Sequence, residues 1–600
     1  MKLFGIVVSF ILMSVTGVLA EPGILSSKHN LSSWGPGDVK ALTESQVCIF
    51  CHTPHNATPS TPLWNRAILE GTNYDLYESS TMGVTLVQPT GPSRLCLSCH
   101  DGTVGLGAVL SPTGSLGIAM AKELTGRSTM LGTDLRNDHP FSFSYNDALQ
   151  FDPELQGSLP SDLLIYPGNT IHCPTCHDPH DNTYGQFLAV SNKNSGLCTR
   201  CHNVSGWASS THASSNATWN GSGSNPWPWN SKVEALNQRQ TVAENGCENC
   251  HTSHNAGGPQ RLMKYQAEED NCIMNCHNGR VGSTNIAAEF LKDSRHHLEL
   301  ASIGDLSGHA HDPMEDVTAL SGHVECQDCH DSHAVNNVTA LAPLVNGKVQ
   351  GVPGVDSVGS AVAPAQFEYE ICFKCHGDTD QGTPVVTRVL NTVNKRLKFD
   401  STNATLTPSF HPVAGIGTNS NMPSLPSLFE PALNASSVIY CTDCHDSDNS
   451  TKVGGPGPNG PHGSLYSPIL RQRYEMQVGT PESLPAYALC YRCHDRDSIL
   501  SDASFKKNAS GAGGGRGGHS QHLNYFGGTS CSVCHDPHGV YDDTHDSGDH
   551  THLINFDTTV VGAVGGQTYP LFIDNGVFSG RCTLVCHGVT HDGSATYTYP

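Results

Sequence analysis

The sequence predicts a mostly irregular chain, with short helices, a few short hairpins and little regular secondary structure. Among the 600 residues, 61 are glycine and 36 are proline, and only 14% are charged, against about 25% in typical soluble proteins. The 24 cysteines and 34 histidines far exceed what packing requires. Asn-Gly signals within 345–349 and 572–578 predict hairpins. The core is therefore expected to be organised around something that cysteine and histidine bind.

Charge and the first residues limit the partners and the compartment. A formal net charge of -23 removes the basic surface that a nucleic-acid partner requires. Lys2, the apolar run 3–13 and the small residues ending at Ala20 predict a signal peptide over residues 1–20. No later segment offers 18 uninterrupted apolar residues, so we expect an exported chain without a transmembrane anchor.

All 24 cysteines fall in twelve pairs, and a histidine follows each pair at once. Ten pairs have the spacing C-x-x-C-H: Cys48/Cys51/His52, Cys96/Cys99/His100, Cys173/Cys176/His177, Cys198/Cys201/His202, Cys247/Cys250/His251, Cys326/Cys329/His330, Cys372/Cys375/His376, Cys441/Cys444/His445, Cys490/Cys493/His494 and Cys531/Cys534/His535. Two pairs are widened by one residue: Cys272/Cys276/His277 and Cys582/Cys586/His587. These twelve motifs are numbered 1 to 12 in chain order below.

This spacing suits covalent haem attachment. Two thiols about one helical turn apart can form thioethers with the two vinyl groups of a haem, and the adjacent imidazole then reaches the iron as its proximal ligand. Disulfides and zinc sites also use C-x-x-C, but neither requires histidine at the same offset in all twelve motifs. The sequence therefore predicts twelve covalently bound haems of the c type, with the twelve motif histidines as proximal ligands and no catalytic side chain.

An alternation divides the motifs into two kinds. Motifs 1, 3, 5, 7 and 11 continue as C-H-x-x-H, whereas motif 9 reads C-H-D-S-D and the even motifs lack the extension. This predicts a two-haem module repeated six times. With the signal peptide at 1–20, the expected modules are 21–140, 141–215, 216–290, 291–400, 401–505 and 506–600.

The run CIFCHTPHNA around Cys48 and the alternating C-H-x-x-H pattern resemble the doubled C-x-x-C-H multihaem cytochromes of metal-respiring bacteria. The resemblance implies an electron carrier located outside the cell or on its outer surface, or alternatively in the periplasm. It implies other cytochromes or redox proteins as partners, and extracellular metal oxides as acceptors. Some relatives form haem-stacked filaments, and the second histidine of C-H-x-x-H usually ligates a neighbouring haem.

Histidine is the expected distal ligand. Eight methionines remain after the leader, too few for twelve irons, whereas 22 histidines lie outside the motif positions. Bis-histidine haems of low potential are therefore expected. The distal candidates are the second histidines of C-H-x-x-H, the histidines of polar loops, and one histidine from each of the pairs 296/297 and 519/522: His55, His180, His254, His333 and His538; His29, His139, His212, His411 and His462; His296 and His522.

Eight other histidines are expected in solvated loops: His172, His309, His311, His323, His545, His550, His552 and His591. Among these, His309 and His323 are the first alternatives as distal ligands.

Electron conduction fits these counts better than catalysis. Spare histidines exceed the vacant iron positions, and lysine-ligated C-x-x-C-K motifs are absent from the sequence. The alternative is a multihaem reductase with one open haem that acts on a nitrogen or sulfur oxyanion. His29 lies on a polar arm before motif 1, where it is expected to reach a neighbouring chain in a homopolymeric filament. A monomeric shuttle and a subunit of an outer-membrane conduit remain alternatives.

Overall fold

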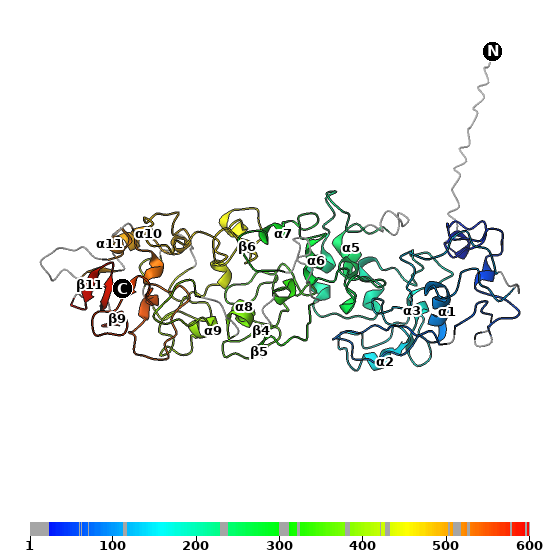
Figure 1. Ribbon diagram of the computed structural model, residues 1–600, viewed down its shortest axis with the longest axis horizontal. Coiled ribbons are helices and arrows are strands. Elements are labelled where there is room, and N and C mark those ends of the chain that lie inside the picture. The colour runs from blue at the N-terminus through cyan, green and yellow to red at the C-terminus, as the bar shows by residue number, and fades with distance from the viewer. Residues whose placement is uncertain are drawn as a thin grey trace, which may run out of the picture. The chain divides into compact units, whose positions relative to one another are not determined.

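The computed structural model (Figure 1) describes most of the chain after the expected leader. The described residues are 23–58, 61, 63–69, 71–111, 117–227, 238–298, 311–320, 324–378, 384–419, 422–425, 433–501, 505–507, 518–524, 528–576, 579–594 and 597–598. The expected signal peptide, His309 and His323 lie outside this part. No helix among the described residues is long and apolar enough to cross a membrane.

Helices are short, as the glycine and proline content predicts. The two longest each contain a whole Cys motif, at α1 and α8. The α-helices are α1 Gly91–His100, α2 Tyr145–Ala148, α3 Cys173–Cys176, α4 Thr211–Ser214, α5 Val242–Asn245, α6 Glu268–Ile273, α7 Ile286–Glu289, α8 Glu368–His376, α9 Lys395–Lys398, α10 Arg496–Leu500 and α11 His519–Asn524.

Single 3-10 turns (η) carry most other motifs. Those at cysteine motifs are η2 Cys48–Phe50, η4 Cys198–Arg200, η8 Gly246–Asn249, η11 Cys326–Asp328, η12 Cys441–Asp443, η14 Cys490–Arg492 and η16 Cys531–Val533. The others are η1 Ile24–Ser26, η3 Lys193–Ser195, η5 Trp207–Ser209, η9 Gln260–Leu262, η13 Thr451–Val453 and η17 Thr551–Leu553. The predicted fold class, mostly irregular with short helices, is confirmed.

Strands form three two-stranded ladders and one larger sheet near the end of the chain. The ladders pair β1 Phe143–Ser144 with β2 Thr170–Ile171, β3 Ser294–Arg295 with β6 Gly463–Ser464, and β4 Gly354–Val355 with β5 Ala361–Val362. The sheet contains β7 Lys506–Lys507, β8 Val561–Gly562, β9 Leu571–Asp574, β10 Gly580–Cys586, β11 Val589–Asp592 and β12 Tyr597–Thr598. Its strand β10 pairs with β8, β9, β11 and β12, all antiparallel.

The two expected hairpins differ in outcome. Residues 572–576 cover the end of β9 and the start of its connection to β10, where Gly580 pairs with Asp574. Residues 577 and 578 lie outside the described part of the chain. The segment 345–349 forms a turn, with the Val349 amide donating to Asn346 (3.1 Å), while the Val345 amide donates to the distant Gln366. The prediction of a hairpin there is wrong, because the Asn-Gly signal specifies a turn but not the pairing of the flanking residues.

The chain divides into two compact units. The first comprises Met1–His202, Trp229–Gln238 and Ser253–Leu262, and the second comprises Asn203–Pro228, Arg239–Thr252 and Met263–Pro600. Motifs 1 to 4 belong to the first unit and motifs 5 to 12 to the second. The six two-haem modules stay a prediction.

Apolar clusters are small and border the cysteines. One contains Val533, Phe556 and Phe572, with Cys534, Cys582 and Cys586 packed against it. Similar clusters contact Cys272 and Cys326, Cys329, Cys441 and Cys531. Groups of this size bury too little apolar surface to offset the chain entropy of 600 residues, so the segments between them depend on something else for their order.

Candidate haem-binding sites

Most motifs close a single helical turn. In motif 1 the His52 amide donates to the Cys48 carbonyl (2.8 Å), and the same bond joins His330 to Cys326 (2.9 Å) in motif 7. Such a turn places the two cysteines and the histidine on the same side of the backbone, as attachment of both vinyl groups and ligation of the iron require. All 24 cysteines are free thiols rather than disulfides.

Motif 10 shows where the short turns end. Cys493, the second cysteine expected to attach a haem there, lies just beyond the end of η14. In α1 and α8, by contrast, both cysteines and the histidine of the motif lie within the helix. The Cys493 amide still donates to the Cys490 carbonyl (3.1 Å), and the His494 amide donates to the same carbonyl (2.9 Å). Cys493 also lies near Cys444 of motif 9. Haem attachment at Cys493, as at the other cysteines, stays a prediction.

The two widened motifs are built differently. In motif 6 the His277 amide donates to the Cys272 carbonyl (3.0 Å), so the extra residue enlarges the turn without opening it. Motif 12 has no helical turn, because Cys582 and Cys586 both belong to strand β10.

Among the described residues, twelve pairs of histidine rings face one another with nearly equal separations, between 5.9 and 6.3 Å. For the odd motifs the pairs are His52–His180, His177–His254, His251–His333, His330–His462, His445–His538 and His535–His519. For the even motifs they are His100–His29, His202–His139, His277–His212, His376–His296, His494–His411 and, at motif 12, His591–His522. Each pair lies within one of the two units.

These separations fit a metal ion between the rings. Two imidazoles bound on opposite faces of one ion, each through a bond of about 2 Å and with the ring centre roughly 1.1 Å beyond the nitrogen, have centroids about 6 Å apart. Direct aromatic contacts spread over about 4.5–7 Å, whereas these twelve values are nearly constant while the interplanar angle varies from 5° to 80°. The residues therefore fit haem irons with two histidine ligands.

Backbone carbonyls orient many of these rings through their Nδ1 atoms. His100 bonds to Thr129 (2.7 Å), His212 to Ser332 (2.8 Å) and His330 to Lys348 (2.7 Å). His29, His139, His177, His411, His445, His522 and His535 have equivalent carbonyl partners. A ring that donates its Nδ1–H to a carbonyl presents the Nε2 lone pair on its other side, which is the usual arrangement of a metal-bound histidine.

Burial keeps several of the paired imidazoles neutral. It lowers the pKa of His177, His445 and His494 to about 4 and that of His462 to about 3. At neutral pH these nitrogens are unprotonated, as a metal ligand must be.

Two comparisons with known proteins bear on these sites. The family described as "Doubled CXXCH motif" matches residues 167–206, which contain motifs 3 and 4. A relative named "C-type cytochrome OmcS", from Geobacter sulfurreducens, is 24% identical over 338 residues, covering 48% of this chain and 76% of the relative. The chain is a multihaem c-type cytochrome.

The partners of the cytochrome's odd motifs follow one rule. After motif 1, the second histidine of each C-H-x-x-H faces the motif histidine two motifs earlier: His180 faces motif 1, His254 motif 3, His333 motif 5 and His538 motif 9. Motif 9 has Asp448 in place of a second histidine, and His462 faces motif 7 instead. His519 faces the last odd motif.

The even motifs follow a second rule. The histidine facing each of them lies upstream of the odd motif that precedes it, as His212 lies before motif 5 and faces motif 6. No sequence pattern marks these residues except a polar loop. Their spacing to the preceding odd motif is a signal that becomes visible only once the pairs are known.

Eleven of the twelve expected distal histidines lie in these pairs, and His55 does not. Its side chain is exposed. The rule for the odd motifs explains this, because a second histidine faces the site two motifs earlier and motif 1 has no earlier site. Sequence reasoning missed two paired residues: it chose between His519 and His522, whereas both are paired, and it placed His591 in a solvated loop. His296 is the paired member of 296/297, and His297 is exposed.

Several other histidines have structural contacts. The buried His172 contacts Ser93 Oγ through Nδ1 (2.9 Å), and the buried His550 contacts Ser547 Oγ through Nε2 (2.9 Å). His311 Nδ1 contacts the Glu325 carboxylate (2.6 Å). These three are held by the protein fold rather than exposed in loops.

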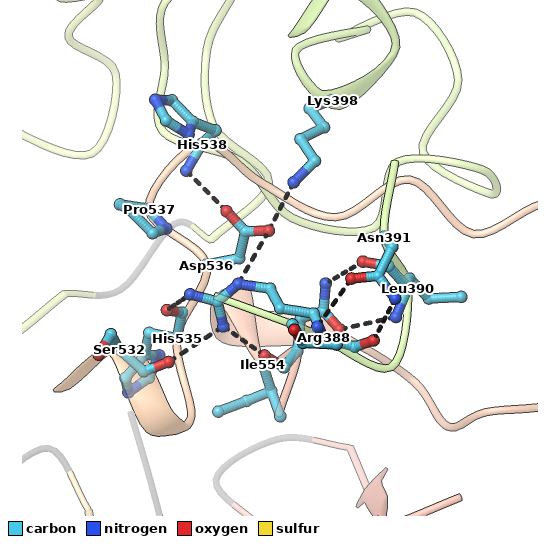
Figure 2. A network of polar contacts seen from close by, with 12 residues as sticks. Arg388, Leu390, Asn391, Lys398, Ser532, His535, Asp536, Pro537, His538 and Ile554 are labelled. Carbon is cyan, nitrogen blue, oxygen red and sulfur yellow. Dashed lines mark hydrogen bonds and ion pairs between the residues drawn. The ribbon is translucent and has the colours of Figure 1, made fainter. Parts of the chain in front are cut away.

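A buried polar network fixes motif 11 (Figure 2). Arg388 donates to the carbonyls of Ser532 (3.1 Å) and His535 (3.0 Å), and Lys398 Nζ lies 2.6 Å from the Asp536 carboxylate. Asp536 Oδ1 in turn accepts from the His538 amide (3.2 Å). The network thus connects the turn that holds the motif to the ring that faces motif 9.

Proposed function

We propose that the cytochrome binds twelve haems and carries electrons along them, each iron having two histidine ligands. The observation that carries this proposal is the set of twelve histidine pairs with nearly equal separations. Haem iron bound by two imidazoles cycles between two oxidation states at low potential. The chain's own contribution is to hold the ring pairs and to keep neighbouring sites close.

Contacts between cysteines of successive motifs support a continuous electron path within each unit. The Cys96 sulfur of motif 2 lies within hydrogen-bonding reach of Cys173 of motif 3, and Cys372 of motif 8 within the same reach of Cys441 of motif 9. Cys272 of motif 6, Cys326 of motif 7 and Glu268 have ligand atoms within 4.8 Å of one another. Since both thiols belong to haem motifs, this cluster supports two neighbouring haems rather than a separate metal ion.

We further propose that the cytochrome is exported and transfers electrons to acceptors outside the cell, such as metal oxides, with other redox proteins as partners. The acidic composition favours cationic docking surfaces on those partners. His29 faces His100 within the same chain and stacks on Phe187 at 4.1 Å. The proposed electron path therefore does not require His29 to reach a neighbouring copy, whether the carrier is a monomer or a filament.

Mass spectrometry and electron paramagnetic resonance test the haem content and ligation together. The holoprotein is expected to exceed its processed chain by twelve haem masses, and all twelve ferric irons are expected to be low-spin. A high-spin iron in the untreated protein would favour a reductase with an open haem. Ten or eleven haems would show that a widened motif is empty.

A further inference from the structure

Motif 12 is the one motif among the described residues that is built on a strand. Cys582 and Cys586 lie at the third and last positions of β10, and β11 begins after the two residues His587 and Gly588. Both turn residues have positive φ, 50° and 76°, as a two-residue type I′ hairpin turn requires. His587 is thereby placed in a tight turn, and its side chain is exposed.

The hairpin places another histidine beside the cysteines. Alternate residues of a strand share one face, so Cys582, Leu584 and Cys586 lie on the same face of β10. Leu584 pairs with His591 of β11, and residues directly opposite each other in an antiparallel pair project to the same face. His591 therefore shares the face of the two cysteines.

That face is directed toward motif 11. Leu584 is buried in the cluster that also contains Val533 and contacts Cys534. Cys534 of motif 11 packs against the same cluster as Cys582 and Cys586. A haem attached to these cysteines would lie against the preceding haem site, on the side where His591 projects.

A ligand from a separate element completes the site. The rings of His591 and His522 have centroids 6.3 Å apart at an interplanar angle of 28°, the separation shared by the eleven other pairs. His522 also obeys the rule of the even motifs, since it lies upstream of motif 11. Helix α11 carries both His519 and His522, three residues apart and so on one face, and supplies a ring to each of motifs 11 and 12.

We infer that the iron of the twelfth haem is held by His522 and His591, and that the motif histidine His587 lies outside its coordination. This inference rests on the proposed function, because it requires a haem attached at Cys582 and Cys586. The strand explains the exchange of ligand. A helical turn brings the residue after the second cysteine under the haem, whereas a strand carries it past the attachment points, and the returning strand supplies a histidine on the correct face.

Methionine substitutions in the full-length holoprotein test the assignment. A methionine ligand raises the potential of a haem and gives its ferric form a near-infrared charge-transfer band. His591→Met is expected to show this band from one haem, together with one component of raised potential, and His522→Met serves as the positive control. His587→Met, the matched variant in the same hairpin, is expected to show neither.

The outcomes separate the inference from the proposed function. A band in His587→Met but not in His591→Met would overturn the assignment, and so would a band in His522→Met alone. Absence of the band from both His522→Met and His591→Met, with twelve haems attached, would overturn it as well. Peptide mass mapping that finds Cys582 and Cys586 without haem in the unsubstituted protein would instead refute full loading, and with it the proposed function at this motif.

Discussion

The odd and even sites differ in both the origin and the angle of their ring pairs. For the first five odd motifs the interplanar angle is between 5° and 33°, and in four of them the partner follows a later motif directly. For the first five even motifs the angle is between 42° and 80°, and the partner lies in an upstream loop. A repeated motif thus supports two geometries, because the motif fixes one ring while the chain that delivers the other ring sets its orientation.

The short C-H-x-x-H link explains the regularity of the odd sites. In motifs 3, 7 and 11 an aspartate follows the motif histidine, and its carboxylate accepts from the amide of the second histidine: Asp178 to His180 (2.9 Å), Asp331 to His333 (2.9 Å) and Asp536 to His538 (3.2 Å). Such Asx turns bend the chain locally. Consequently the second ring leaves the turn in a fixed direction, toward the site two motifs earlier.

Loss of an odd partner is expected to have the largest effect. His333→Ala removes the ring that faces His251, so one haem of twelve should become high-spin ferric by electron paramagnetic resonance, and added imidazole should restore the low-spin signal. His55→Ala, at the same position of motif 1, is the matched control. Because His55 is exposed, all twelve haems should stay low-spin, and a high-spin signal in this control would contradict the intrachain pairing rule.

The contribution of the aspartate after the motif histidine to the free energy of unfolding is expected to differ between sites. Asp536→Ala leaves Arg388 and Lys398 buried, both only 8% exposed, without their carboxylate, and should lower the free energy of unfolding by about 3–5 kcal/mol. Asp178→Ala removes a carboxylate that is 51% exposed and should cost about 1 kcal/mol or less. Denaturant unfolding of the holoproteins measures both, and equal losses would refute the role of the buried cations.

The sequence predicts the local turns at most of the motifs and only part of the ring pairs. Spacing within a motif is local, so the helical turn at Cys326 follows from C-x-x-C-H alone. Which motif a second histidine faces is a property of the folded chain, and His462 replaces the missing histidine of motif 9 from a loop with no distinguishing pattern. His591 could not be found from the motif, because the choice between a turn and a strand at Cys582–Cys586 depends on pairing with β9 and β11.

A smaller effect is expected on the potential of one odd site. His254 Nδ1 contacts the carboxylate of Asp138 (2.9 Å), whereas ten other paired rings contact backbone carbonyls. A carboxylate partner makes the imidazole a stronger donor and so stabilises the ferric state. Asp138→Asn should raise the potential of the motif 3 haem alone in a spectroelectrochemical titration. An unchanged titration curve would show that the carboxylate only positions the ring.

The smallest expected effect concerns the tilt of an even pair. Parallel imidazoles split the iron d orbitals more than crossed imidazoles do. The ferric protein should therefore give rhombic low-spin signals from the first five odd sites and broad signals with a larger maximum g value from the first five even sites. His494 faces His411 at 62° and contacts Ser424 Oγ through Nδ1 (3.0 Å). Ser424→Ala removes a hydrogen bond worth about 1 kcal/mol, which frees the His494 ring to rotate and should shift one broad signal while the rhombic signals stay fixed. A shift among the rhombic signals instead would show that the odd and even geometries are not independent. The interplanar angle of a histidine pair would then be set by contacts between neighbouring haem sites rather than by the segment that delivers each ring.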